Sequence, residues 1–138
     1  MKYSITDLQQ VASHGLTPPP CDTTMQVTVN EAQDGVAKGI WDVDQKFING
    51  LGVVMGGFIS SAADILMAYA IASKLTENQG FVSIDLDTTF HRPAFEGEIE
   101  VIAKVEKLGR TLAYVVAELV QNEKKIATCV SSLLIQQK

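Results

Sequence analysis

The sequence has few cysteines and histidines, and their spacing excludes several classes of site. It contains two cysteines, Cys21 and Cys129, without a Cys-x-x-Cys pair, and two histidines, His14 and His91. Two widely separated cysteines indicate reduced thiols in a cytoplasmic protein, not a disulfide framework or a zinc site. Two histidines also leave few ligands for a transition metal. We therefore expect no metal site.

Positive charge is scarce as well. The 138 residues include 11 Lys and Arg against 16 Asp and Glu, which gives a formal net charge of -5. Because no stripe of basic residues is available to neutralise phosphates, nucleic acid is not expected as the main partner. The first ten residues lack the apolar stretch of a secretory signal, which again favours a cytoplasmic location. The length predicts one domain with its own core.

The most apolar stretch is residues 47–73, in which Asp64 is the only charged side chain. Glycines precede a run that contains neither Gly nor Pro until Gly80, and this predicts a helix from residues 55–58 to a point near Leu75. Its circumference is almost wholly apolar, so we expect it to be buried all round. A transmembrane span is the alternative, but the mid-helix carboxylate and the glycine-rich start disfavour it.

Ahead of this helix, the chain predicts a short helix, a linker and a hairpin. Residues 6–13 have a helical apolar stripe, and Pro18-Pro19-Pro20 predicts an extended linker. Alternation at 25–30 and 36–43, around a turn at Asp34-Gly35, predicts two paired strands. We therefore divide the chain into a terminal helix and linker, residues 1–23, and a single domain, residues 24–138.

After the helix, the pattern is that of long strands. Residues 81–90 predict one continuous strand with Val82, Ile84, Leu86 and Thr88 on the same face. Three more strands are expected at 98–108, 111–121 and 125–136. A hairpin, a long helix and a series of antiparallel strands predict an α+β fold, in which a curved sheet wraps around one buried helix.

The entry to the helix resembles the pattern of a known family. Asn49, Gly52, Gly56-Gly57 and Asp64 occur in the order and spacing of the PaaI-like acyl-CoA thioesterases, which have the hotdog fold. Segments farther along are also similar to recurrent family segments: Val82-Ser83-Ile84-Asp85, Arg92-Pro93-Ala94 and Lys107-Leu108-Gly109-Arg110-Thr111. The resemblance covers nearly the whole chain after the linker. It implies hydrolysis of an acyl- or aryl-acyl-CoA, with no cofactor besides the coenzyme A of the substrate.

The resemblance also implies roles for Gly56 and Asp64 that agree with their chemistry. It places the Gly56 amide at the thioester carbonyl, and a helix N-terminus offers free N–H groups that stabilise an oxyanion. Gly56 and Gly57 have no Cβ, so a substrate can approach this backbone closely. Asp64 would be the general base or nucleophile, because an apolar helix disfavours its charged form. The alternative is a structural carboxylate bonded to a neighbouring strand or partner chain.

Ser83 and Asn49 complete the candidate catalytic set. Ser83 would position water or Asp64, or else is an ordinary serine on a half-buried strand face. Asn49 would bind the thioester or a water molecule through its amide, or else adopts a left-handed turn conformation in Asn49-Gly50.

One residue departs from the family pattern. Met55 stands where the family has a histidine, and a thioether neither holds a proton near neutral pH nor donates a hydrogen bond. Met55 would therefore contact the substrate without that chemistry. Two other functions stay open: a non-catalytic module that binds acyl-CoA or an acyl carrier, and a hotdog dehydratase or hydratase. The second needs a histidine–acid pair, for which His14 and His91 are badly placed.

Basic residues at strand ends are candidates for binding the phosphates of coenzyme A, although solvated turn charges are an equal alternative. They are His91, Arg92, Lys107 and Arg110. The resemblance implies a homodimer formed by joining two sheets, which assembles further to a homotetramer. Asn49 and Gly56 would then face Asp64 and Ser83 of the partner subunit. The need to cover an exposed sheet edge independently favours oligomerisation.

Overall fold

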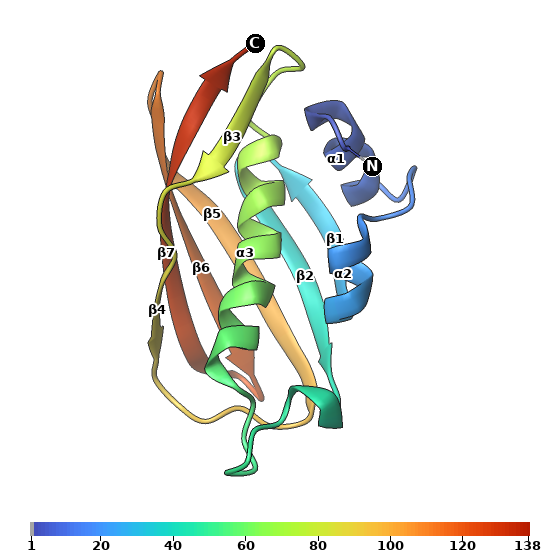
Figure 1. Cartoon of the computed structure of the whole chain (residues 1–138), viewed down its shortest axis with the longest axis vertical. Helices are drawn as coiled ribbons and strands as arrows, with labels where there is room; N and C mark the ends of the chain where they lie inside the picture. Colours follow the sequence, from blue (N-terminus) through green and yellow to red (C-terminus); the bar gives the residue numbers. More distant parts are fainter. Residues whose placement is uncertain (1) are drawn as a thin grey trace.

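A computed structural model describes residues 2–138, which form a seven-stranded antiparallel sheet curled around one long helix (Figure 1). The strand order is β1-β2-β5-β6-β7-β3, and β4 also pairs with β7. The elements are α1 (Ile5–Ala12), α2 (Pro20–Met25), β1 (Val27–Gln33), β2 (Val36–Val43), the 3-10 helix η1 (Gln45–Phe47), α3 (Gly56–Ala72), β3 (Gln79–Ser83), β4 (Asp87–Phe90), β5 (Gly97–Leu108), β6 (Leu112–Gln121) and β7 (Lys124–Gln137). The predicted α+β hotdog arrangement is confirmed.

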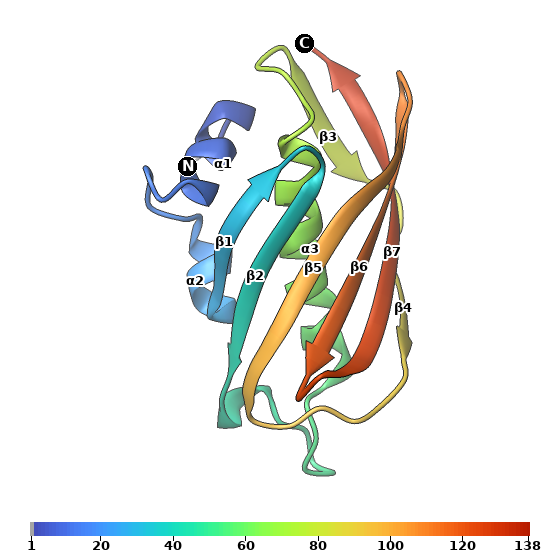
Figure 2. The same cartoon turned by 180° about the vertical axis from the view of Figure 1, so that it is seen from behind.

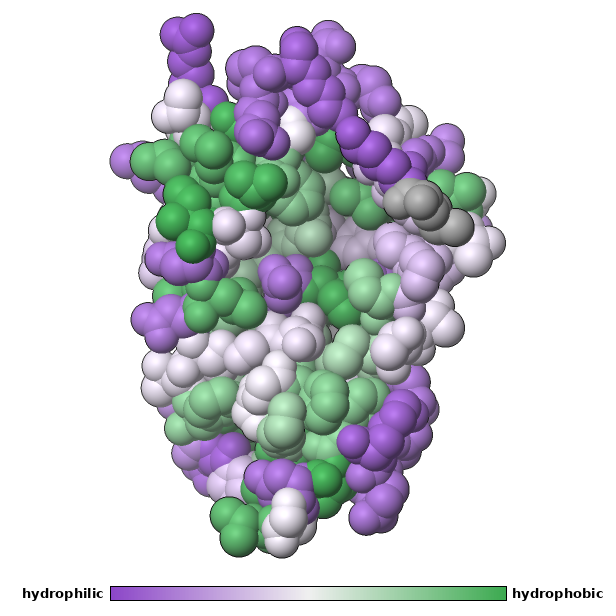
Figure 3. All heavy atoms as spheres, viewed as in Figure 1, coloured by the Kyte–Doolittle hydropathy of each residue, from purple (hydrophilic) through white to green (hydrophobic). Residues whose placement is uncertain are grey.

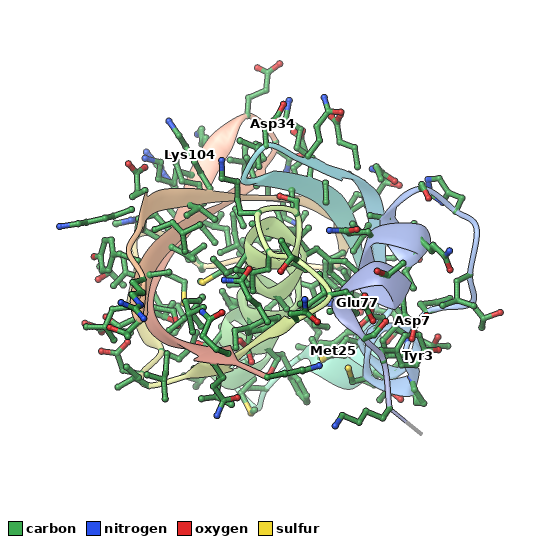
Figure 4. All side chains as sticks on the ribbon, turned by 90° about the horizontal axis from the view of Figure 1, so that it is seen from above. Tyr3, Asp7, Met25, Asp34, Glu77 and Lys104 are labelled. Atoms are coloured by element: carbon green, nitrogen blue, oxygen red, sulfur yellow. The ribbon has the colours of Figure 1, made fainter. Side chains whose placement is uncertain are left out.

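Helix α3 supplies the centre of the core. Leu66, Met67 and Ile71 are fully buried against strand residues such as Trp41 and Ile99. Figure 2 shows the strands passing over the rear of α3, and Figure 4, which looks along the helix, shows the sheet curling around it with α1 beside it. The helix begins where the glycines predict, but ends at Ala72, because the N–H groups of Lys74 and Leu75 bond back three residues and tighten the last turn.

The expectation that α3 is buried all round is wrong for one face. Gly57 and Asp64 are exposed, and Ser61, Ile65 and Ala68 are only half-buried. These residues follow one another at helical spacing along the side of α3 that the sheet leaves open. The uncovered face therefore contains the helix's one charged residue.

The single strand predicted at 81–90 is also wrong, because an extra residue interrupts it. Ser83 pairs with Leu133 and Asp87 with Val130, so four steps along one strand match three along the other. The Asp85 carboxylate accepts the N–H of Ser132 at 2.7 Å in the gap. This is the geometry of a β-bulge, which reverses the alternation of faces.

The bulge decides which side chains point toward α3. Ser83 lies opposite the buried Leu133, and Thr88, five residues later, lies opposite the buried Cys129. Thr88 also shares a 2.8 Å hydrogen bond with Ser60 of α3. Val82 and Thr88 therefore do not share a face, whereas Ser83, although exposed, lies on the face of the sheet that is turned toward α3.

The N-terminal residues form two helices instead of one helix and an extended linker. Helix α1 has the predicted position, and Ser4 and Asp7 form a capping box at its start. Helix α2 was not predicted: Pro20 occupies its first turn, where a missing N–H costs nothing. The prolines extend the chain only as far as Pro19, and the next residues turn back toward α3.

Candidate active site

The first turn of α3 presents two free backbone donors. No protein acceptor within residues 2–138 contacts the N–H of Gly56 or Gly57, and no side chain caps the helix. A Cβ atom on Gly56 would lie 2.8 Å from Cζ of Phe90, so the aromatic ring covers this residue closely and a larger residue fits only if the ring moves. On Gly57 it would meet only Cε of Met55, at 3.2 Å. These groups can donate to a developing oxyanion.

The loop before the helix is shaped by Asn49. Its Oδ1 atom accepts the N–H of Leu51 at 2.9 Å and that of Val53 at 3.4 Å. The left-handed residue of this loop is Gly52, with a φ of 84°, so the proposed left-handed conformation of Asn49 is wrong. The Asn49 oxygen is thus occupied within the loop, which leaves its amide N–H₂ as the group available to a substrate.

Asp64 and Ser83 lie together, as the sequence suggests. Both line a hollow of about 370 Å³ between α3, β3 and the N-terminal residues. Within residues 2–138, the Asp64 carboxylate has no hydrogen-bond or ion-pair partner, and surrounding protein atoms raise its pKa by desolvation. A carboxyl group with a raised pKa and no structural partner is suited to accepting a proton.

Gly56 opens into a different hollow. This second space, of about 450 Å³, is lined by residues that include Gly56, Phe90, His91 and Arg92, and it does not include Asp64. Gly56 and Asp64 are eight residues apart on one helix, which corresponds to about 12 Å along its axis. One carbonyl carbon therefore cannot contact both groups of a single chain.

The predicted basic residues are separated into two groups. His91 and Arg92 lie beside the Gly56 hollow, and the His91 ring is held by a 2.9 Å hydrogen bond between Nε2 and Thr128 Oγ1. Lys107 and Arg110 lie at the β5–β6 turn, at the opposite end of the sheet, as the course of these strands in Figure 1 shows. Only the first pair can act near Gly56 of the same chain.

Sequence reasoning missed two sets of residues around the hollows. Lys124 and Lys125, at the β6–β7 turn, share a third hollow of about 560 Å³ with His91 and Arg92. The Tyr69 hydroxyl donates a 2.5 Å hydrogen bond to Oδ2 of Asp22, and both side chains are buried. Burial raises the pKa of Asp22, and burial together with the Asp22 hydrogen bond raises the pKa of Tyr69. Nothing in the sequence around Asp22, which follows the proline run, predicts its hydrogen bond with Tyr69.

In the part of the chain that the structure describes, no group of three or more His, Cys, Asp or Glu side chains is arranged to hold a metal ion. No helix among the same residues combines the length and the apolar character that crossing a membrane requires.

Comparison with known proteins identifies the family. A family model described as the thioesterase superfamily matches residues 51–128, which is more than half of the chain and includes Gly56, Asp64 and Ser83. The chain belongs to the thioesterase superfamily. Within this superfamily, it is 33% identical over 87 residues to a proposed esterase of Pseudomonas aeruginosa; the match covers 62% of this chain and 65% of that protein. The chain thus spans just under two thirds of that relative's length.

Solved structures of thioesterase-like proteins confirm the PaaI-like fold. A proposed thioesterase of Ralstonia eutropha, related to phenylacetic acid degradation, superposes with a TM-score of 0.86 at 23% identity and covers 92% of this chain and 98% of its own. The PaaI protein of E. coli, from the phenylacetic acid degradation operon, gives a TM-score of 0.81 at 24% identity and covers 92% and 91%. A thioesterase of Haemophilus influenzae gives 0.81 at 18% identity and covers 99% and 93%.

Proposed function

We propose that this protein is an acyl-CoA thioesterase, which hydrolyses an acyl- or aryl-acyl-CoA to the free acid and coenzyme A. The observation that best supports the proposal is that helix α3 contains two half-sites, each of which holds one part of the chemistry. One holds Asp64, which has no hydrogen-bond or ion-pair partner among residues 2–138, beside Ser83. The other holds the free N–H of Gly56. Together they supply the base and the oxyanion donor that thioester hydrolysis needs.

In the proposed reaction, Asp64 accepts a proton from a water molecule as the water oxygen attacks the thioester carbon. The new carbon–oxygen bond places negative charge on the carbonyl oxygen, which accepts a hydrogen bond from the Gly56 N–H. When the carbon–sulfur bond breaks, the proton on Asp64 passes to the departing sulfur, so a carboxylic acid and a thiol are formed. Ser83, which lies beside Asp64 on the face of the sheet turned toward α3, would orient the water.

The separation of the half-sites supports a homodimer. Because about 12 Å along the helix divides Gly56 from Asp64 of one chain, each complete site would combine Gly56 of one subunit with Asp64 of another. Within residues 2–138, no further strand lies beside the β3 edge, and apolar side chains near it are exposed, Ile84 to 57%. The others are Val82, Leu86, Leu112 and Leu134. Exposed apolar edges of this kind mark surfaces that pair with another chain. Assembly of two dimers into a tetramer is part of the same proposal.

Four basic residues would hold the phosphates of coenzyme A. His91 and Arg92 adjoin the Gly56 hollow, and Lys124 and Lys125 lie beyond them, with Lys125 also paired to Glu118 at 2.9 Å. Phosphates bind well where several cationic side chains converge. Lys107 and Arg110 would reach coenzyme A only from a second subunit.

The test is thiol release from short, medium, long and aryl acyl-CoAs by the wild type, Asp64→Asn and the matched control Asp34→Asn, which alters an exposed turn carboxylate. We expect Asp64→Asn to lower kcat/KM by roughly 10² to 10⁴, the usual contribution of a general base, and Asp34→Asn to leave it unchanged. Equal rates for wild type and Asp64→Asn would exclude Asp64 as the base. Absence of release from every acyl-CoA would exclude the thioesterase itself.

A second candidate function, non-catalytic binding of acyl-CoA or an acyl carrier, is favoured by Met55. Its side chain is 43% exposed at the start of α3, where the family has an imidazole, and provides no proton. A binding module would be stabilised by acyl-CoA without turning it over. An increase in Tm with no thiol release in the wild type, together with release by Met55→His, would establish this alternative.

A further inference from the structure

The hollow that holds Asp64 is closed on one side by the N-terminal segment, which we define as residues 4–25. Figure 3 shows the face on which it opens, with apolar side chains gathered over β3. Asp64 and Ser83 lie on the α3 and β3 side, whereas the N-terminal segment contributes Leu8, Pro19, Cys21 and Asp22. The remaining lining residues are Ile65, Ala68, Tyr69, Phe81 and Val82. Away from Asp64, the walls are thus mainly apolar.

The N-terminal segment is firmly attached to the rest of the protein. Ile5, Val11 and Met25 are buried in the main core. The Gln9 side chain donates a 3.0 Å hydrogen bond to the carbonyl oxygen of Ala72 at the end of α3, and the N–H of Thr6 donates to Glu77 at 3.1 Å. In Figure 4, Glu77 lies close to α1. The N-terminal segment is therefore held against the rest of the protein through both of its helices.

The closest link between wall and helix is the hydrogen bond from Tyr69 to Asp22. The two residues have exposed fractions of 2% and 3%, and both line the hollow. The other carboxylate oxygen of Asp22 accepts a hydrogen bond from the Cys21 thiol at 3.4 Å. Tyr69 follows Asp64 by five residues on α3, so the Tyr69–Asp22 pair lies farther along the helix than Asp64 does.

We propose that the N-terminal segment is the end wall of the acyl pocket, and that Leu8 and the Tyr69–Asp22 pair limit the size of the acyl group. This inference rests on the proposed function. With the thioester carbonyl at Asp64, the acyl group extends along the apolar wall toward Leu8. About 370 Å³ falls within the range of ligand pockets, roughly 300–1,000 Å³, and the walls away from Asp64 are mainly apolar, so the substrate class is acyl-CoAs with apolar acyl groups.

The first experiment changes the wall and measures acyl preference. kcat/KM is determined for straight-chain acyl-CoAs of increasing length with the wild type, Leu8→Ala and Leu16→Ala. Leu16 belongs to the same segment but lines another hollow, with Val11 and His14, and is the matched control. We expect Leu8→Ala to raise the ratio of long-chain to short-chain kcat/KM by about tenfold, as the loss of a few buried methylene contacts predicts. Leu16→Ala should keep the wild-type ratio.

The outcomes separate the two proposals. Retained hydrolysis of short acyl-CoAs by Leu8→Ala with an unchanged long-to-short ratio overturns the inference and leaves the proposed function standing. If the wild type hydrolyses no acyl-CoA, the proposed function is wrong. The wall is then tested by a second experiment that needs no turnover.

That second experiment uses Cys21 as a reporter, since Cys21 is exposed and lines the hollow whereas Cys129 is buried. The rate of Cys21 alkylation is measured with and without a non-hydrolysable S-alkyl-CoA thioether, at concentrations that saturate its effect on Tm. We expect alkylation to slow severalfold, and more strongly as the alkyl chain lengthens. An unchanged rate at saturation would show that the acyl group does not reach the N-terminal segment.

Discussion

The two-chain site predicts that two inactive variants restore activity to each other. In Gly56→Ala, the added methyl group stands where the substrate carbonyl must approach the N–H, so we expect kcat/KM to fall on the order of a hundredfold or more. The new Cβ would lie 2.8 Å from Phe90, but this ring is 51% exposed and can move, so the variant should fold. In Asp64→Asn, the oxyanion donor stays and the base is lost.

Co-expression of the two variants, with different tags, forms mixed dimers. Each mixed dimer contains one site with both defects and one site with neither, because each site takes Gly56 from one subunit and Asp64 from the other. Random pairing makes half of the dimers mixed, so thiol release should recover to about a quarter of the wild-type rate.

The control for this experiment is Gly50→Ala, in the same loop. Among the described residues, none besides the two chain neighbours of Gly50 has an atom within 4 Å of the Cβ position on Gly50, so this variant should keep both full activity and Tm. If purified mixed dimers release thiol no faster than the two single variants, the site lies within one chain and the two-chain reasoning is refuted.

Three more predictions follow from the charges and the β3 edge. The raised pKa of Asp64 places the acid limb of the kcat/KM profile above about pH 4, where an ordinary aspartate titrates. A midpoint at or below that value would contradict Asp64 as a base of raised pKa. Because the pKa of Asp22 is raised, the folded protein binds the Asp22 proton more tightly than the unfolded chain does. The contribution of this proton to stability is complete below about pH 4 and is lost as the pH rises through the pKa of the folded state. The Tm of Asp22→Asn relative to wild type should therefore increase from pH 4 to pH 7, and a constant difference in thermal melts would refute this. Ile84→Glu places a charge on the apolar edge, so it should halve the apparent mass in size-exclusion chromatography and lower activity about tenfold or more. The control Leu16→Glu should change neither the apparent mass nor the activity.

Much of the fold could be predicted because neighbouring residues determine it. The alternation at Val36–Val43 predicts β2 with its observed bounds, and the glycines before Phe58 predict where α3 begins. The position of Asp64 on the helix follows from its spacing to Gly56. Each of these features depends on residues close together in the chain, since helix and strand periodicities are local.

The tertiary structure alone decided which side chains meet. The extra residue between Ser83 and Asp87 is visible only against the register of β7, and it places Thr88 on the same face as Ser83. Lys124 joins Arg92 because the β6–β7 turn ends beside β4, and Asp22 meets Tyr69 because α2 packs on α3. These contacts join residues that are tens of positions apart. The sequence by itself determined the elements and the candidate groups. Strand register and helix packing depend on the whole core, and they determined the half-sites and the wall that encloses one of them.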